Sequence, residues 1–199
     1  MKLKVGNAPL ICKEVLLKAS EMMFVIYLPV VMPGSDLRLP KNLEWCAELF
    51  KYIDYGIHDY VYISAKSMFV GPECRGRAGW HLDGFGTDDI NYVWSDCHPT
   101  EFCIQDIQVT NDCVLSMQEL EQQVCIDNII TYPNNTLLRM DNTVVHRVSV
   151  SQEFGIRTFV KISVSSSKYN LAGNAHNYLF DYGWDLSERN LERNHPTYK

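Results

Sequence analysis

Short strand-like segments dominate the sequence between residues 59 and 166. They are rich in β-branched and aromatic residues, and turn-forming residues separate them. The segments are residues 59–64, 67–71, 90–95, 101–109, 128–132, 136–140, 143–150 and 157–165. Many short strands with little helix between them favour a barrel or sandwich over a parallel sheet with crossover helices. The sequence therefore predicts a mainly β fold.

Two helices are expected to flank these strands. The first covers residues 40–56, with Pro40 in its first turn and Gly56 as its stop. Its apolar face comprises Leu43, Cys46, Leu49 or Phe50, and Ile53. The second is expected to begin at Ser116, because Ser116 and Glu119 have the spacing of a capping box. Both helices are short enough to cover a β core.

The most apolar run, residues 22–32, predicts one or two buried strands interrupted near Pro29. A membrane helix needs about 20 apolar residues, so this run is too short to span a bilayer. The first residues lack the apolar stretch of a signal peptide. The seven cysteines include no CxxC pair, which argues against a zinc ribbon. We therefore expect a cytoplasmic protein with free thiols and no membrane contact.

The charge of the chain bears on its partners. With 18 basic and 24 acidic residues, the formal net charge is −6, which disfavours a broad surface for long nucleic acid. Two arginines, Arg75 and Arg77, lie just before a histidine motif described next and would suit an anionic group. Their alternative role is a solvated loop, which is more common for short charge clusters.

The stretch GWHLDG places His81 and Asp83 two residues apart, just before a glycine-rich turn. On a strand this spacing directs both side chains to one face, where they can chelate a metal ion. A single motif of this kind occurs by chance in many proteins. Its meaning depends on whether the chain supplies a third ligand.

A third ligand is present in NTVVHRVSV, where His146 lies among valines in a predicted strand. Arg157 follows eleven positions later, at the start of another apolar strand. A buried arginine needs an anionic partner. Two imidazoles and one carboxylate occupy one face of an octahedral metal and leave three positions open, as in non-haem Fe(II) oxygenases.

The pattern formed by His81, Asp83, His146 and Arg157 resembles the Fe(II)/2-oxoglutarate-dependent dioxygenase superfamily. The resemblance implies a double-stranded β-helix, a jelly-roll or cupin-like barrel with flanking helices. It also implies one oxygenase-like domain over residues 1–199. In that domain residues 59–166 form the core, residues 1–58 support it and residues 167–199 wrap around it.

The resemblance also implies residue roles. His81, Asp83 and His146 would be the iron ligands and catalytic centre, and Arg157 would bind the distal carboxylate of 2-oxoglutarate. Oxidative decarboxylation of the cosubstrate would drive substrate oxidation, most simply hydroxylation, with ascorbate as reductant in assays. Some members have a serine two residues after the arginine, where this chain has Phe159. A second cosubstrate contact is assigned to Tyr62.

Other candidates for that second contact are Ser64, Asn91 and Tyr92. The substrate stays open among a small molecule, a nucleotide-like compound and a peptide side chain. Two other functions are compatible with the same residues. The first is a binding protein that holds an anionic ligand, such as a nucleotide, without chemistry. The second is a cupin-type metal enzyme that does not use 2-oxoglutarate, although such sites more often have further histidines near the first.

Overall fold

The computed structural model describes residues 2–72, 79–149 and 153–189. Within these ranges the chain forms eleven strands, one α-helix and two 3-10 helices. The strands are β1 (Lys2–Val5), β2 (Leu10–Glu14), β3 (Phe24–Val31), β4 (Tyr60–Val70), β5 (Ile90–Ser95), β6 (Glu101–Cys103), β7 (Ile107–Thr110), β8 (Ile129–Thr131), β9 (Thr136–Met140), β10 (Val145–Arg147) and β11 (Gly155–Ser165). The helices are η1 (Lys41–Tyr52), α1 (Cys113–Gln123) and η2 (Ile126–Asn128). The predicted mainly β fold with flanking helices is confirmed.

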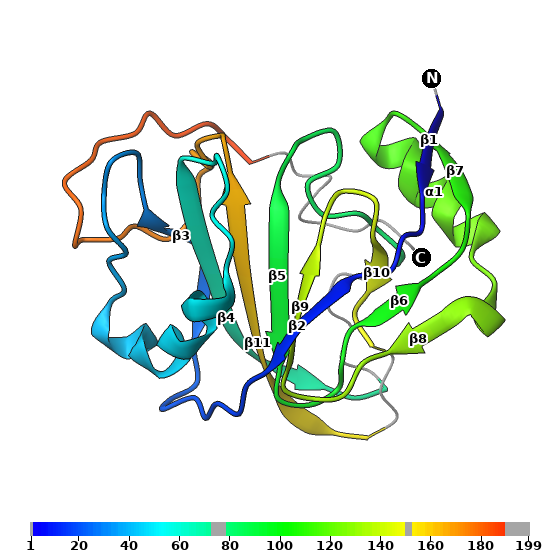
Figure 1. The fold of residues 1–199 in the computed structure, drawn as a ribbon, viewed down its shortest axis with the longest axis horizontal. Coiled ribbons are helices and arrows are strands. Elements are labelled where there is room, and N and C mark those ends of the chain that lie inside the picture. Colours follow the sequence, from blue (N-terminus) through cyan, green and yellow to red (C-terminus); the bar gives the residue numbers. More distant parts are fainter. Residues whose placement is uncertain (1, 73–78, 150–152, 190–199) are drawn as a thin grey trace.

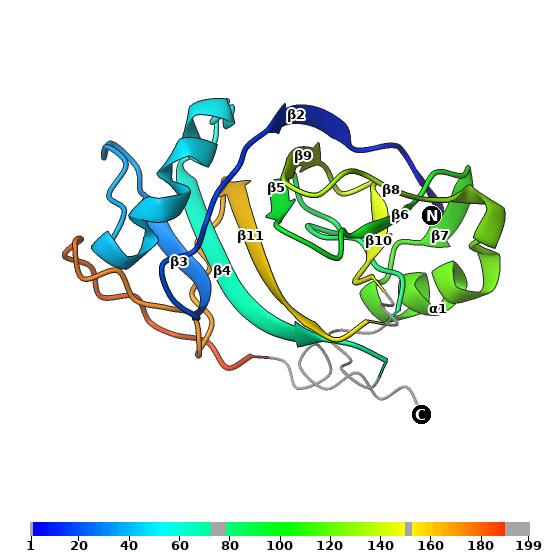
Figure 2. The same cartoon turned by 90° about the horizontal axis from the view of Figure 1, so that it is seen from below.

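Six strands form the largest sheet, in the order β2-β9-β5-β11-β4-β3. A second sheet has the order β10-β6-β8, and β1 pairs with β7. All of these pairings are antiparallel. Figure 2 shows β4 and β11 on one side of the molecule, with β6 and β10 facing them from the other. The two sheets therefore bracket the space in which the predicted site residues lie.

Strands β4 and β11 pair along their whole length, from Gly155 opposite Val70 to Ser165 opposite Tyr60. They form the long central ribbon of the large sheet (Figure 1). The sequence predicted two strands here, 59–64 and 67–71, but the continuous partner β11 keeps residues 65 and 66 extended. In contrast, predicted segment 101–109 splits into β6 and β7, because each half pairs with a different sheet.

The helix predicted over 40–56 is present as η1, which ends at Tyr52. Its buried residues include Leu43, Cys46 and Leu49. Their spacing of three matches the period of a 3-10 helix, which explains the helix type. Together with residues from β4, β5 and β11, they form the main core on one side of the large sheet.

The second helix, α1, begins three residues before the predicted start. Asp112 is the N-cap, and its side chain accepts hydrogen bonds from the amides of Val114 and Leu115. Ser116 is buried in the first turn, and Glu119 bonds to Thr110 of β7 instead of closing a capping box. The predicted cap was therefore wrong, because an aspartate four residues earlier serves this role.

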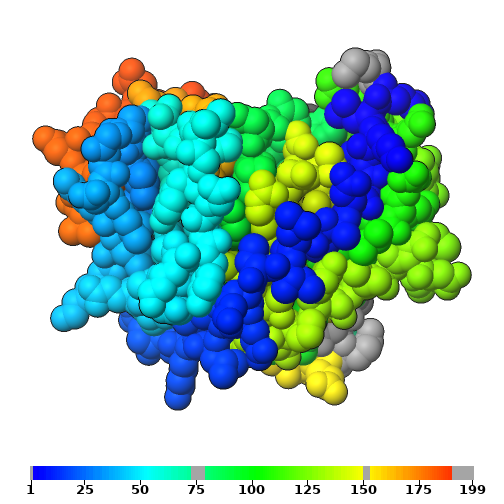
Figure 3. Space-filling view, in the orientation of Figure 1, coloured from blue at the N-terminus to red at the C-terminus, as the bar shows by residue number. Residues whose placement is uncertain are grey.

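The segment over residues 22–32 forms one strand, β3, with register shifts between Val25 and Leu28 and between Pro29 and Val31. Figure 3 shows the N-terminal residues running across one face of the molecule. Described residues beyond β11 continue along β3, where the Asn177 amide donates to the Pro29 carbonyl at 2.8 Å. In the described parts of the chain, no helix is long and apolar enough to cross a membrane.

Candidate metal centre and adjoining cavity

His81 and His146 are brought together by the backbone. They form an isolated antiparallel bridge in which each amide donates to the other residue's carbonyl, at 3.0 and 3.1 Å. Residues paired directly in this way project their side chains to the same face. The imidazole centroids accordingly lie 4.4 Å apart. The strand geometry places two nitrogen ligands side by side, although residues 81 and 146 are far apart in sequence.

Each imidazole is held in the tautomer that a metal ligand requires. Nδ1 of His81 lies 3.0 Å from the carbonyl oxygen of Gly79, and Nδ1 of His146 lies 3.0 Å from that of Val144. A carbonyl oxygen can only accept, so both Nδ1 atoms carry the proton. The Nε2 lone pairs are then directed to other partners, the usual arrangement for metal-binding histidines.

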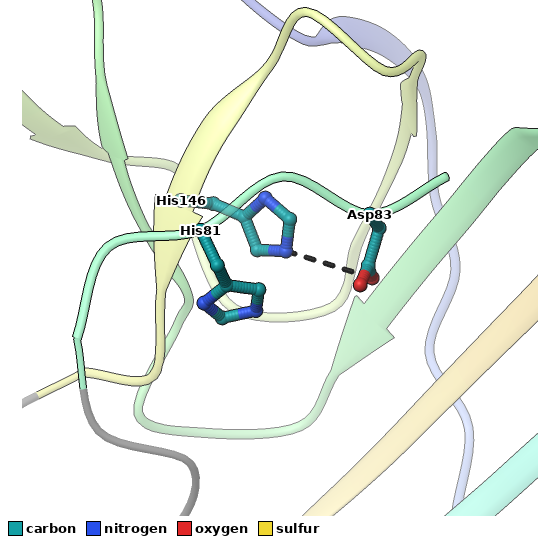
Figure 4. A group of neighbouring side chains, drawn as sticks. All are labelled: His81, Asp83 and His146. Carbon is teal, nitrogen blue, oxygen red and sulfur yellow. Dashed lines mark ion pairs between the residues drawn. The ribbon is translucent and has the colours of Figure 1, made fainter. Parts of the chain in front are cut away.

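Asp83 completes the cluster from the turn after His81. Oδ2 of Asp83 lies 3.6 Å from Nε2 of His146, and one ligand atom from each residue lies within 4.8 Å of the others. Figure 4 shows the two rings and the carboxylate converging. Gly84 has a φ of 68°, which lets the chain turn away directly after Asp83.

The donor set fits an octahedral divalent ion. With bonds of about 2.1 Å, ligands on one face of an octahedron lie about 3 Å apart, so these ligand atoms, which lie within 4.8 Å of one another, would move closer together around a bound ion. Two neutral imidazoles and one carboxylate suit Fe(II) and leave half of the coordination positions open. His81 and His146 are 8% and 6% exposed, so the protein would shield a bound ion from bulk water.

A cavity of about 180 Å³ opens beside this cluster. Its floor is the β4–β11 ribbon, in which Ser64, Lys66 and Met68 lie opposite Lys161, Phe159 and Arg157. The remaining lining residues are Tyr27, His81, Asp83, Thr100, His146, Arg147 and Val148. Alternate residues of a strand point to one face, which explains why positions 157, 159 and 161 all contribute.

Arg157 is 1% exposed and lines this cavity. Nη2 donates to Oγ1 of Thr100 at 2.9 Å, and the guanidinium lies 4.8 Å from the Phe159 ring centroid. Burial lowers the pKa of Arg157 to about 10, so it is still charged at neutral pH. No carboxylate from the described residues lies within ion-pair distance, and Nε has no hydrogen-bond partner there.

Lys161 was not identified from the sequence. Its ammonium lies 3.0 Å from Oδ2 of Asp83 and 3.2 Å from the hydroxyl of Tyr27. Burial alone would raise the pKa of the Asp83 carboxyl, but the Lys161 ammonium holds it well below its usual range. The strand period gave a signal that could have identified this residue, because Lys161 is four positions after Arg157 and shares its face.

The structure places Tyr62 in a different environment from the other four predicted site residues. Its hydroxyl donates to the carbonyl of Ser167 and accepts from the amide of Tyr169, both at 3.0 Å. Tyr62 does not line the cavity, whereas Ser64 on the same strand does. Asn91 and Tyr92, the downstream candidates, are bonded to Ser163 and Asp54.

Further cavity residues were not identified from the sequence: Tyr27, Lys66, Met68, Thr100, Arg147 and Val148. Tyr27 and Lys66 come from strands β3 and β4. Arg147, next to His146, bonds to Glu101 at 2.6 Å and stacks over Trp80 while it lines the cavity. The Arg75–Arg77 pair lies outside the described residues.

Compared with known proteins, the chain matches no family model, no curated protein and no solved structure.

Proposed function

We propose that this protein is an Fe(II)- and 2-oxoglutarate-dependent oxygenase that hydroxylates a small-molecule, nucleotide or peptide substrate. One observation carries the proposal. The three-residue cluster of His81, Asp83 and His146 lines the same cavity as Arg157, a buried cation without a carboxylate partner among the described residues. A metal centre and an anion site within one cavity are what the joint binding of Fe(II) and 2-oxoglutarate requires.

In this proposal His81, Asp83 and His146 hold the iron. Arg157 binds the distal carboxylate of the cosubstrate, and Thr100 keeps the guanidinium in place through its hydrogen bond. The bound iron supplies oxygen activation coupled to decarboxylation of 2-oxoglutarate to succinate and CO2. The cavity walls supply orientation of the substrate and exclusion of water.

The proposal includes a finer description of the fold, a double-stranded β-helix formed as a single domain. Two features support it. Both sheets are antiparallel, and the cavity is lined by residues of β4 and β11 from the large sheet and β10 from the small one. In such a barrel the ligand site lies between the two sheets.

Ordered binding of metal and cosubstrate tests the proposal. Mn(II) replaces Fe(II) without oxygen chemistry, and calorimetry then measures 2-oxoglutarate affinity with and without the metal. We expect tight cosubstrate binding only with Mn(II), and its loss in His81→Ala and in Arg157→Met. An exposed-residue variant, Lys168→Met, is the matched control for loss of a cation. Equal 2-oxoglutarate affinity with and without metal would contradict the proposal.

The alternative function is a non-catalytic protein that holds an anion in this cavity. The cavity favours it in one respect, because four of its lining residues are cationic: Lys66, Arg147, Arg157 and Lys161. This alternative predicts anion binding that depends on Arg157 but not on His81. The same titrations therefore separate the two functions.

A further inference from the structure

A second pocket adjoins the metal cavity. It has a volume of about 170 Å³ and lies between β3 and the segment after β11. Figure 1 shows this segment, in orange, beside β3. Its aromatic walls comprise Tyr27, Tyr169, His176, Tyr182 and Trp184. Tyr27 lines both the pocket and the metal cavity, so this residue forms the boundary between the two spaces.

The aromatic rings are held in place from behind. Tyr169 stacks on the buried Tyr62 ring with centroids 4.1 Å apart and an interplanar angle of 7°. Its hydroxyl donates to Asp89 at 2.7 Å. The ring of Trp184 packs edge-on against that of Tyr62, with centroids 6.5 Å apart, and its centroid lies 4.7 Å from that of Tyr182. A ligand that enters the pocket would therefore meet preorganised faces and have little side-chain entropy to remove.

Tyr27 adopts a conformation that directs it to the boundary. It has a φ of 49°, which is uncommon for a bulky residue, and it lies in the register shift of β3 between Val25 and Leu28. Its amide donates to Oγ of Ser64 at 2.9 Å, and its hydroxyl accepts from Lys161 at 3.2 Å. Backbone strain maintained by such contacts is typical of ligand sites.

The charges of the metal cavity restrict what can bind across this boundary. Of its four cations, Lys161 pairs with Asp83, Arg147 pairs with Glu101, and Arg157 is assigned to 2-oxoglutarate. Lys66 is left: its ammonium lies 5.5 Å from the Phe24 ring centroid, and no described carboxylate lies within ion-pair distance of it. An anionic group on the substrate would satisfy this ammonium.

We propose that the substrate is a planar aromatic or heteroaromatic compound that carries an anionic group. Its ring stacks in the aromatic pocket against Trp184, because the Tyr182 ring is already stacked on His176 with centroids 4.3 Å apart, and its anionic group lies near Lys66. This inference rests on the proposed oxygenase function and names the substrate class of that site. A quaternary ammonium ligand, which aromatic pockets can also hold, is disfavoured because the described residues that line the aromatic pocket include no acid, and the neighbouring cavity has four cationic lining residues and one acid, Asp83.

The test uses protein loaded with Mn(II) and 2-oxoglutarate and titrated with defined probes. Four probes combine a ring with an anion: AMP, UMP, phenyl phosphate and indole-3-acetate. Adenosine presents a ring alone, and inorganic phosphate presents an anion alone. We expect at least one combined probe to bind about 10-fold or more tightly than either single-feature probe. Stacking on one aromatic residue is worth about 1–3 kcal/mol, a range that includes this factor.

Two variants locate the binding. Trp184→Ala should weaken the best combined probe about 10-fold, and Lys66→Met should weaken it by a similar factor. Tyr178→Ala is the matched aromatic control, because Tyr178 is 90% exposed and does not line the pocket. Thermal unfolding of each variant checks that the fold is retained.

Two results would overturn the inference. The first is that no combined probe binds more tightly than inorganic phosphate. The second is that Trp184→Ala and Tyr178→Ala have the same affinity for the best combined probe. Failure of 2-oxoglutarate to bind at the outset would instead refute the proposed function, so the two failures are distinguishable.

Discussion

The ammonium of Lys161 lies 3.0 Å from the carboxylate of Asp83, in an ion pair that is largely buried. Asp83 is also one of the three residues of the candidate metal centre. Lys161 therefore balances the charge of Asp83 and orients its carboxylate before any metal binds. The same lysine also bonds to Tyr27, so it links the metal centre to the boundary of the aromatic pocket.

Replacement of Lys161 with methionine should destabilise the metal-free protein and increase its response to metal. Removing one partner of a buried ion pair costs about 3–5 kcal/mol of unfolding free energy, because the other charge stays buried. A divalent ion would restore the balance at Asp83, so Mn(II) should raise the melting temperature more in Lys161→Met than in wild type. Calorimetric unfolding with and without Mn(II) measures this. Equal gains in both proteins would show that Lys161 and the metal do not share Asp83.

Replacement of Arg157 with methionine should stabilise the protein while it removes cosubstrate binding. Arg157 is buried without a carboxylate partner among the described residues, and burial lowers its pKa, which is a sign of desolvation cost. Replacing buried charges with apolar groups of similar volume can stabilise by about 1–4 kcal/mol. Denaturant unfolding of the metal-free proteins tests the prediction. A clear loss of stability would indicate that Arg157 is held by structural contacts instead.

The thiol of Cys46 should resist alkylation in the folded protein. Burial in the core raises its pKa to about 12, so the reactive thiolate is scarce below that pH, and access is blocked as well. Cys113 and Cys125 are exposed and should react readily. Mass spectrometry after iodoacetamide treatment at pH 8, with and without denaturant, identifies each labelled residue. Rapid labelling of Cys46 without denaturant would contradict the packing of η1 against the sheet.

Asp112 and not Ser116 caps α1, so replacing Asp112 with alanine should destabilise the protein and replacing Ser116 should not. Asp112→Ala loses the acceptor for two amides and should lower the free energy of unfolding by about 1 kcal/mol. Ser116 lies inside the helix, where its hydroxyl donates to the Cys113 carbonyl at 3.1 Å. Loss of this bond and the better helix propensity of alanine oppose each other, so Ser116→Ala should change the free energy of unfolding by less than about 0.5 kcal/mol. Urea unfolding of both variants decides between the two positions as the helix start.

The strand pattern predicted the β content and most strand positions, because alternation and β-branched residues are local signals. Local signals failed where pairing with another strand determines where a strand begins and ends. Residues 65 and 66 resembled a break, yet β11 pairs through them. The same limit applies to the turn after Cys103, where β6 and β7 separate because they join different sheets.

For the candidate site, the sequence predicted the residues that carry distinctive chemistry. His81, Asp83, His146 and Arg157 all line one cavity. Tyr62 has the residue type expected for a cosubstrate contact, but its direction depends on Tyr169, which approaches from 107 positions away. Tyr27 could not be identified from sequence, because a register shift and an unusual φ direct it to the cavity. Contacts set by distant segments are invisible to motif spacing.

The measurement that tests the central claim most directly is succinate formation from 2-oxoglutarate. Purified protein would be incubated with Fe(II), ascorbate and 2-oxoglutarate under air, beside His81→Ala and the control variant His58→Ala, whose histidine lines neither the metal cavity nor the aromatic pocket. We predict succinate from wild type and His58→Ala and none above background from His81→Ala, because loss of one imidazole removes a metal ligand. Equal rates of succinate formation by wild type and His81→Ala would contradict the oxygenase assignment. So would the absence of succinate from wild type in assays to which AMP, UMP, phenyl phosphate or indole-3-acetate is added.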